Sequence, residues 1–360
     1  MEKSEIKFCL RTTDEDNLEK LFKVADCLRG QYVGDQVHLR ALVEISNFCR
    51  RGCAYCGLRS GNRAVRRYRM SDAEILDCAI KAARLGYGTV VLQAGEDPVL
   101  SEKRIANLVR RIVGETGLAV ALSLGERTTD ELAAWREAGA TRYLLRFETS
   151  DEHLFRAIHP MRPGQTGRHP RIELLREISQ LDYETGSGVM VGIPGQSYST
   201  LADDLLSFSA LGLDMIGVGP WVPHPATPLA DTLPTASPMQ VPHSPSMTLR
   251  VIALARIICP GANIPATTAL ATVGGDEFME RALRCGANVI MPDMTPARYR
   301  ADYCIYPGKH GFYQDTDRQD EMLKTKISAL GLRPGAGPGS SPSWLARRDT
   351  GKMRAMGGVL

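Results

Sequence analysis

The 360-residue sequence lacks the features that mark proteins of membranes, secretion or nucleic acids. No apolar run approaches the ~20 residues that a membrane-spanning helix needs. The N-terminal stretch MEKSEIKFCLRTTDEDN is charged and has no apolar core of the kind found in signal peptides. The formal net charge is only +3, and no basic tract is broad enough to predict nucleic-acid binding. We therefore expect a globular protein of the cytoplasm with no nucleic-acid or membrane partner.

The sequence also lacks a second group of closely spaced cysteines. Of its nine cysteines, six stand singly in apolar or helical contexts, where cysteine is usually a small buried hydrophobe. The other three, Cys49, Cys53 and Cys56, have the spacing C-x₃-C-x₂-C. A structural zinc site completed by a distant residue is one interpretation, but such sites normally show two ligand pairs. An iron–sulfur cluster fits better, because thiolates are its usual ligands and three of them leave one iron of a four-iron cluster free.

Strand and helix patterns alternate along most of the chain. Eight strand candidates, most of them followed by a helical pattern, lie at residues 38–46, 89–95, 118–124, 141–148, 185–192, 214–220, 263–269 and 287–292. This alternation predicts a parallel sheet, and eight units predict a closed (β/α)₈ barrel of the TIM type, with an open doubly wound sheet as the alternative. Polar and Gly-rich segments recur at the strand ends, which favours the barrel because they would converge on one mouth.

Three parts are predicted along the chain. Residues 1–35 show helical spacing of apolar residues and form an N-terminal helical extension. Residues 36–332 form the barrel. Residues 333–360 are rich in Gly, Pro and Ser and are predicted to be a flexible tail.

The cysteine pattern, with Tyr55 just before the last cysteine, resembles the signature of the radical S-adenosylmethionine (SAM) enzymes. The resemblance implies one [4Fe-4S] cluster held by Cys49, Cys53 and Cys56, with SAM bound at the fourth iron. One electron, from a reductant such as ferredoxin or flavodoxin, would then cleave SAM to methionine and a 5′-deoxyadenosyl radical. A second cluster is not expected, because only Cys304 lies in the region where some relatives carry it.

Other strand ends resemble the cofactor-binding segments of the same family. In LQAGED, Gly95 and Glu96 match a Gly-Gly-Glu segment that meets the SAM amino group, while Ala94 replaces its first glycine. Glu148 suits a ribose hydroxyl or an ammonium group. Arg171 suits the SAM carboxylate, although alone it could be a surface residue and Arg168 competes for the role. The resemblance also assigns four further residues to the cofactor side: Tyr55, Ser123, Gly192 and Gly195, of which the two glycines are turn glycines in the alternative interpretation.

A collinear series of motifs from residue 32 to about 309 resembles one branch of this superfamily, the radical SAM maturases of [FeFe]-hydrogenases, which are related to biotin synthase and methylornithine synthase. It includes "NFCRRGCAYCGLR", "VLQAGEDP", "LSLGER", "RYLLRFET", "VGPWVPHPATPLA" and "NIPATTALATV". The resemblance implies a role in assembling the diiron subcluster of the hydrogenase, with a small anionic substrate in the barrel cavity and other hydrogenase maturases as candidate partners. The implied substrate side comprises Arg146, Thr267, Thr268, Tyr303 and Tyr306, with Tyr299 nearby.

Two departures keep other functions open. Many members of the family carry a hydroxyl residue where this chain has Ala94 or Ala121, and both positions are expected to face the cavity. Losing two donors favours a different substrate, because an unpaired polar group in a dry cavity costs about 1–3 kcal/mol. The alternatives are a paralogue acting on another small anionic, amino-acid-like or sulfur-containing molecule, a methylornithine synthase-like mutase, and a non-catalytic iron–sulfur carrier.

Overall fold

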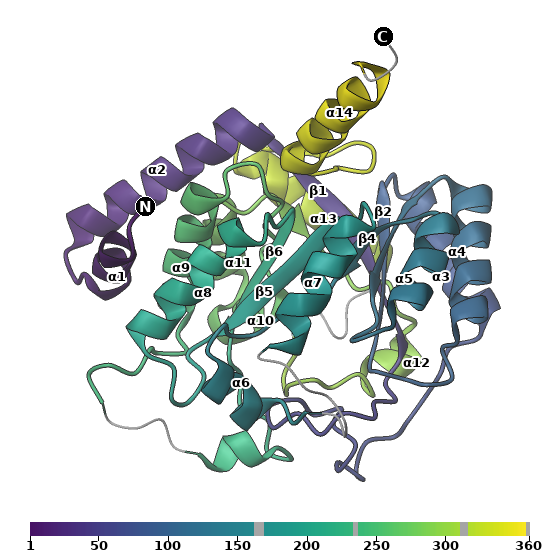
Figure 1. The fold of residues 1–360 in the computed structure, drawn as a ribbon, viewed down its shortest axis with the longest axis horizontal. Coiled ribbons are helices and arrows are strands. Elements are labelled where there is room, and N and C mark those ends of the chain that lie inside the picture. The colour runs from purple at the N-terminus through teal and green to yellow at the C-terminus, as the bar shows by residue number, and fades with distance from the viewer. Residues whose placement is uncertain (162–168, 233–236, 310–315, 358–360) are drawn as a thin grey trace.

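The computed structural model describes residues 1–161, 169–232, 237–309 and 316–357 of the chain (Figure 1). Its parallel sheet runs in the order β6-β5-β4-β3-β2-β1-β7, and β8 pairs with the start of β1. The strands are β1 (Gln36–Ser46), β2 (Thr89–Ala94), β3 (Ala119–Ser123), β4 (Ala140–Leu144), β5 (Glu184–Val191), β6 (Met215–Pro220), β7 (Val289–Ile290) and β8 (Arg333–Pro334).

Residues 263–266 close the sheet into a barrel. Asn263 bridges Met215 of β6, and Pro265 bridges Val289 of β7. The predicted barrel is therefore confirmed, but the predicted strand at 263–269 is too long. Proline has no N–H for a ladder, and the Thr267 side chain accepts a hydrogen bond from Leu270 N, so helix α10 begins at Thr268.

Helices surround the sheet and follow most of its strands, as predicted. They are α3 (Asp72–Arg84), α4 (Glu102–Thr116), α5 (Thr129–Glu137), α6 (Glu152–Ile158), α7 (Pro170–Gln180), α8 (Tyr198–Ala210), the 3₁₀ turn η1 (Pro228–Asp231), α9 (Pro245–Ile258), α10 (Thr268–Gly274), α11 (Asp276–Leu283), α12 (Ala297–Arg300) and α13 (Thr316–Ala329). A capping box of Ser71 and Glu74 starts α3. A cap of this kind fixes the residue at which a helix begins, and therefore where the loop between the preceding strand and that helix ends.

The N-terminal region forms two helices, α1 (Lys3–Arg11) and α2 (Glu15–Val33), as its apolar spacing predicts. Asp14 caps α2 by accepting hydrogen bonds from two backbone N–H groups, which separates the two helices. Figure 1 shows both of them lying along the outside of the barrel, where α1 packs on α8 and α2 packs on α9.

The C-terminal segment is packed more firmly than its composition predicts. After β8 it crosses the N-terminal end of the barrel and enters α14 (Pro342–Gly357). The backbone carbonyls of Pro338 and Gly339 accept hydrogen bonds from Arg142 and Arg40, and Trp344 is buried. These contacts hold residues 338–344 against the barrel, because buried arginines at this end of the barrel require acceptors.

Candidate functional site

The three clustered cysteines lie on the loop after β1, at the end of the barrel opposite α14 (Figure 1). Cys49, Cys53 and Cys56 are free thiols, and burial raises the pKa of each, that of Cys53 to about 12. Such thiols stay protonated until a cation binds them, and a metal ion deprotonates its cysteine ligands. Their chemistry thus fits a metal–thiolate centre better than a catalytic nucleophile.

Gly95 brings the loop after β2 against this cysteine loop. A Cβ atom at Gly95 would lie 2.3 Å from the carbonyl oxygen of Phe48 and 2.7 Å from Cβ of Cys49. Only glycine permits that approach. Gly95 and Glu96, which the sequence assigned to the cofactor side, lie on this loop, and the three thiols beside them have the chemistry of an iron–sulfur donor set.

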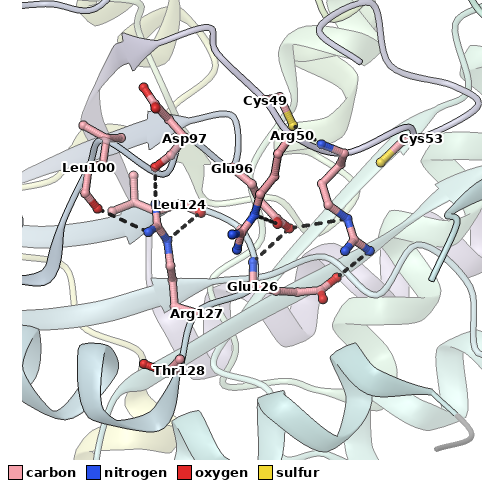
Figure 2. A network of polar contacts seen from close by, with 12 residues as sticks. Cys49, Arg50, Cys53, Glu96, Asp97, Leu100, Leu124, Glu126, Arg127 and Thr128 are labelled. Carbon is pink, nitrogen blue, oxygen red and sulfur yellow. Dashed lines mark hydrogen bonds and ion pairs between the residues drawn. The ribbon is translucent and has the colours of Figure 1, made fainter. Parts of the chain in front are cut away.

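A network of charged side chains lies behind the cysteine loop (Figure 2). Arg50 lies 3.6 Å from Glu96, which comes from the loop after β2. Arg51 forms an ion pair of 3.4 Å with Glu126, which comes from the loop after β3. The backbone N–H of Glu126 donates to Glu96 at 3.1 Å, so three mouth loops are joined by one set of contacts. Arg127 secures the same region by donating to the carbonyl oxygens of Leu100 and Leu124.

Arg171 joins this network from the first turn of α7. It is buried rather than on the surface, and its Nε donates to Glu126 at 3.1 Å while its Nη1 donates to the carbonyl oxygen of Arg146 at 2.7 Å. Its competitor for the SAM carboxylate, Arg168, lies outside the described residues. The geometry brings Arg171 to the mouth of the barrel, in contact with Glu126 and Arg146.

His159 links the network to the cysteines, and sequence reasoning missed it. Its Nε2 lies 2.7 Å from Arg51 and 3.0 Å from Arg171, while its Nδ1 lies 3.0 Å from Cys53 Sγ. Burial, followed by the charge of Arg171, lowers the pKa of His159 to about 3. Nε2 also lies 3.2 Å from Glu126 Oε1, so the ring hydrogen-bonds within this network on one side and reaches the Cys53 sulfur on the other. Hydrogen bonds to sulfur of this kind tune metal–thiolate centres.

The loops after β4 and β5 lie beside the cysteine loop. Glu148 has a positive φ of 65° and forms an ion pair of 3.2 Å with Arg146. Gly192 has φ of 83°, and a Cβ atom there would lie 2.3 Å from the backbone of His243. Gly195 also has a positive φ of 90°. Both glycines are therefore required by the turn whether or not they also contact a ligand.

The remaining cofactor-side predictions occupy the same end of the barrel. Tyr55 packs against an apolar cluster formed by Ile158, Met190, Ile193, Trp221 and Leu229. Ser123 is the last residue of β3 and is half-buried. Between them these residues supply an apolar wall and a hydroxyl, which suits a nucleoside with one apolar face and a polar edge.

A cavity of about 150 Å³ lies inside the barrel. Three cationic side chains and one carboxylate line it: Arg40, Arg146, Lys309 and Glu44. Lys309 contacts Glu44 and lies 2.9 Å from Asp293, and burial raises the pKa of Glu44 to about 8. Carboxylates outside the wall also pair with these cations, Glu184 with Arg40 at 3.8 Å and Glu148 with Arg146 at 3.2 Å.

The structure places most of the predicted substrate-side residues on this cavity wall. Arg146, Thr267, Thr268 and Tyr306 line it, as does Ala121, whereas Ala94 and Tyr303 are not among its lining residues. Tyr299 stacks on Tyr68 with ring centroids 4.6 Å apart and donates to Glu74, so its role is packing. The cavity is thus less polar at strand β3 than a hydroxyl residue would make it.

No helix among the described residues is long and apolar enough to cross a membrane. Within the same residues, no group of three or more His, Cys, Asp or Glu side chains is spaced to hold a metal ion. The case for a cluster therefore rests on the chemistry of the three thiols, on their spacing in the sequence and on the similarities that follow.

Comparisons with known proteins agree with the sequence motifs. The family model of the radical SAM superfamily matches residues 43–208. The [FeFe] hydrogenase maturase subunit HydE of Thermotoga maritima is 44% identical over 332 residues, which are 92% of this chain and 91% of that protein. The 3-methylornithine synthase of Methanosarcina acetivorans is 27% identical over 92% of this chain and 89% of that protein. The crystal structure of methylornithine synthase (PylB) has the same fold, with a TM-score of 0.77 at 24% identity over 93% of this chain and 94% of that one.

Proposed function

Because this chain belongs to the radical SAM superfamily and, within it, to the family of the [FeFe] hydrogenase maturase HydE, we propose that it cleaves SAM reductively in the maturation of an [FeFe]-hydrogenase. The reaction would serve the assembly of the diiron subcluster. One observation carries the proposal: identity of 44% to HydE extends over nearly the whole of both chains. The three free thiols at the mouth of the barrel agree with it.

The cofactors follow from the residues of the mouth. We propose that Cys49, Cys53 and Cys56 hold one [4Fe-4S] cluster, which supplies an electron and an open iron site when it is bound. Glu96 and Arg171 come from two sides of the cysteine loop and would orient the amino and carboxylate groups of SAM. Both side chains are buried at the mouth, beside the cysteine loop.

The substrate would occupy the internal cavity. Arg146 and Lys309 line it, and Thr267, Thr268 and Tyr306 add neutral donors. Nε of Arg146 is buried with no hydrogen-bond partner among the described residues, and an anion in the cavity would accept from it. This supports a small anionic substrate, with the cofactor held at the mouth above it.

A second candidate function is favoured by Ala121. It lines the cavity, at a position where many relatives present a hydroxyl group. The wall therefore offers one donor fewer, which fits a paralogue acting on another small anionic, amino-acid-like or sulfur-containing molecule. A methylornithine synthase-like mutase is a variant of this candidate.

An electron must enter from a reductant, and the loop that carries the cysteines offers a docking surface. Residues 45–71 contain seven arginines and neither Asp nor Glu. Several of them, including Arg50, Arg63 and Arg66, are exposed. A basic surface attracts an acidic partner, which fits a small electron carrier such as ferredoxin or flavodoxin. Other hydrogenase maturases remain candidate partners through the family resemblance.

The proposal is tested by anaerobic SAM cleavage. The cluster is reconstituted and reduced with dithionite, SAM is added, and 5′-deoxyadenosine is measured by chromatography. We expect slow formation that Cys53→Ala abolishes, because two thiolates do not hold the cluster. Cys27→Ala is the matched control: this cysteine is exposed on α2, and its loss is expected to leave the rate unchanged.

Failure to form 5′-deoxyadenosine with an intact four-iron cluster, in the presence and absence of candidate substrates, would contradict the proposal and favour a non-catalytic carrier. If the reaction occurs, two additions distinguish the candidate substrates. Acceleration by a cysteine-bound iron complex supports the hydrogenase role. Acceleration by an amino acid or a sulfur-containing acid alone supports the paralogue.

A further inference from the structure

A buried carboxylate ties together the two loops that follow β4 and β5. Asp204 lies on α8 and is fully buried. Its Oδ1 accepts hydrogen bonds from Ser150 N at 2.5 Å, Ser150 Oγ at 2.7 Å and Thr149 Oγ1 at 3.2 Å. Its Oδ2 accepts from Gln196 Nε2 at 3.2 Å. One side chain thus reaches the loop after β4 through Oδ1 and the loop after β5 through Oδ2.

The orientation of the Gln196 amide is fixed by the backbone around it. Its Oε1 accepts from Gly192 N at 2.7 Å, and its Nε2 donates to the carbonyl oxygen of Met190 at 3.1 Å. A flipped amide would place two donors, or two acceptors, face to face. Gln196 therefore presents only N–H to Asp204, and position 204 must supply an acceptor to it.

The two loops carry residues that need such support. Glu148 adopts φ of 65°, which costs a non-glycine residue free energy and is stable only when its surroundings hold it. Thr149 and Ser150, which Asp204 holds, follow it directly. Gly192 adopts φ of 83° and packs against the backbone of His243. Asp204 thus holds the loop after β4 directly, at the two residues that follow Glu148. It holds the loop after β5 through Gln196, which in turn binds Gly192.

We propose that Asp204 is a positioning residue for the adenosyl half of SAM, because it sets the spacing between the loop of Glu148 and the loop of Gly192. This inference rests on the proposed function, since those loops are the predicted nucleoside-binding loops. All four donors to Asp204 are neutral groups, so the carboxylate is held by hydrogen bonds and not by a cation. Burying a carboxylate without a cation costs free energy. A neutral residue would support the fold equally well if the only role of position 204 were packing.

The test compares Asp204→Asn with its neighbour Asp203→Asn in the reconstituted full-length protein under anaerobic conditions. Dissociation constants are measured by calorimetry for SAM, for 5′-deoxyadenosine and for methionine. The buffer is at pH 8, because burial raises the pKa of Asp204 to about 7 and the carboxylate is then ionised. Asp203 is partly exposed and pairs with Lys3 at 2.6 Å. Asp203→Asn therefore makes the same carboxylate-to-amide change on the same helix without touching either loop.

An asparagine at position 204 has one acceptor for donors on two loops and turns its own N–H₂ toward one of them. We expect Asp204→Asn to weaken SAM and 5′-deoxyadenosine about tenfold, the order expected from one lost buried hydrogen bond to a charged group. Methionine binding is expected to stay unchanged, as is the binding of all three ligands to Asp203→Asn. Unchanged SAM affinity in Asp204→Asn, or equal weakening of methionine, would overturn the inference.

A smaller change separates positioning from general damage. If Asp204→Asn does not fold, Ser150→Ala removes only the hydroxyl contact and is expected to weaken SAM by about threefold without affecting methionine, and the absence of that effect would overturn it.

The two proposals fail in different ways. If the original protein holds its cluster but binds no SAM, the proposed function is wrong and this inference falls with it. If the original protein binds SAM and Asp204→Asn binds it equally well, only the inference about Asp204 is wrong.

Discussion

The two ends of the barrel both bury arginine–glutamate clusters, but they are completed differently. At the N-terminal end, Arg142 and Glu184 form an ion pair of 2.7 Å with side chains that are 1% and 0% exposed. The C-terminal segment covers them, and its carbonyl and hydroxyl groups accept hydrogen bonds from Nη2 of Arg142. At the mouth, Arg51, Arg171 and Glu126 lie beside three free thiols that burial keeps protonated.

This difference separates stability from chemistry. At the covered end, the chain supplies partners for its own buried charges, so that they stabilise a single arrangement. At the mouth, buried carboxylates and guanidiniums are gathered around three thiols whose chemistry suits a metal centre. In barrels of this class, residues at the N-terminal face serve stability and those at the C-terminal face serve catalysis. The predictions below test that division.

The largest effect is expected at the covered end, from Arg142→Ala. Removal of the guanidinium leaves Glu184 fully buried, with Arg40 the nearest cation at 3.8 Å. Breaking a buried ion pair in this way costs about 3–5 kcal/mol of unfolding free energy. Anaerobic urea unfolding measures it, with Arg111→Ala, an exposed pair with Glu115, as the control expected to lose under about 0.5 kcal/mol.

Arg142→Ala is also expected to take up iron and bind SAM normally where it remains folded. A loss of SAM affinity without a loss of stability would contradict the division between the two ends.

The sequence predicted the barrel and its mouth because both depend on local patterns. The cysteine spacing, Gly95 and Gly192 are local signals, and each glycine is required by a close approach of backbone. The charged clusters depend on contacts between distant residues, such as Arg51 with His159 and Arg40 with Glu184, which no local spacing marks. The sequence signal that could have indicated these buried clusters is a charged residue inside an otherwise apolar strand, such as Arg40 in HLRALVEIS.

The C-terminal segment shows the limit of composition as a predictor. Its Gly, Pro and Ser content is that of a flexible chain, but those small residues are what allow it to lie against the barrel. A Cβ atom at Gly339 would lie 2.4 Å from the ring of His38, and one at Gly88 would lie 1.6 Å from the carbonyl oxygen of Gly337. Close backbone packing and flexibility favour the same residue types, so the tertiary contacts decide between them.

An intermediate effect is expected at the mouth, from Arg171→Ala. Glu126 keeps Arg51 at 3.4 Å and the neutral ring of His159 at 3.2 Å, so its charge is not left alone. We expect a loss of about 1–2 kcal/mol in unfolding free energy, below that of Arg142→Ala, because a hydrogen bond to a charged group is worth that much. The SAM dissociation constant is expected to rise at least tenfold, which corresponds to about 1.4 kcal/mol. Equilibrium binding to the reconstituted protein measures it.

Arg176→Ala is the matched control for that prediction, because it lies on the same helix and more than one turn further along. It is expected to change neither quantity. A fall in stability for Arg171→Ala as large as that for Arg142→Ala, with SAM affinity intact, would place Arg171 among the purely structural arginines.

The smallest effect is a pH dependence that originates at the covered end. Burial, followed by the charges of Arg40 and Arg142, lowers the pKa of His38 from 6.5 to about 4. Between these values the unfolded chain binds a proton on this ring that the folded chain does not, so acidification from pH 6.5 to 4 favours unfolding. The ring is partly exposed, and solvent screening reduces the expected loss to about 1–2 kcal/mol. Urea unfolding of the original protein and of His38→Gln at both pH values measures it. His38→Gln should lose less stability over that interval; equal losses in both proteins would remove His38 as the source and leave the pH response to other groups.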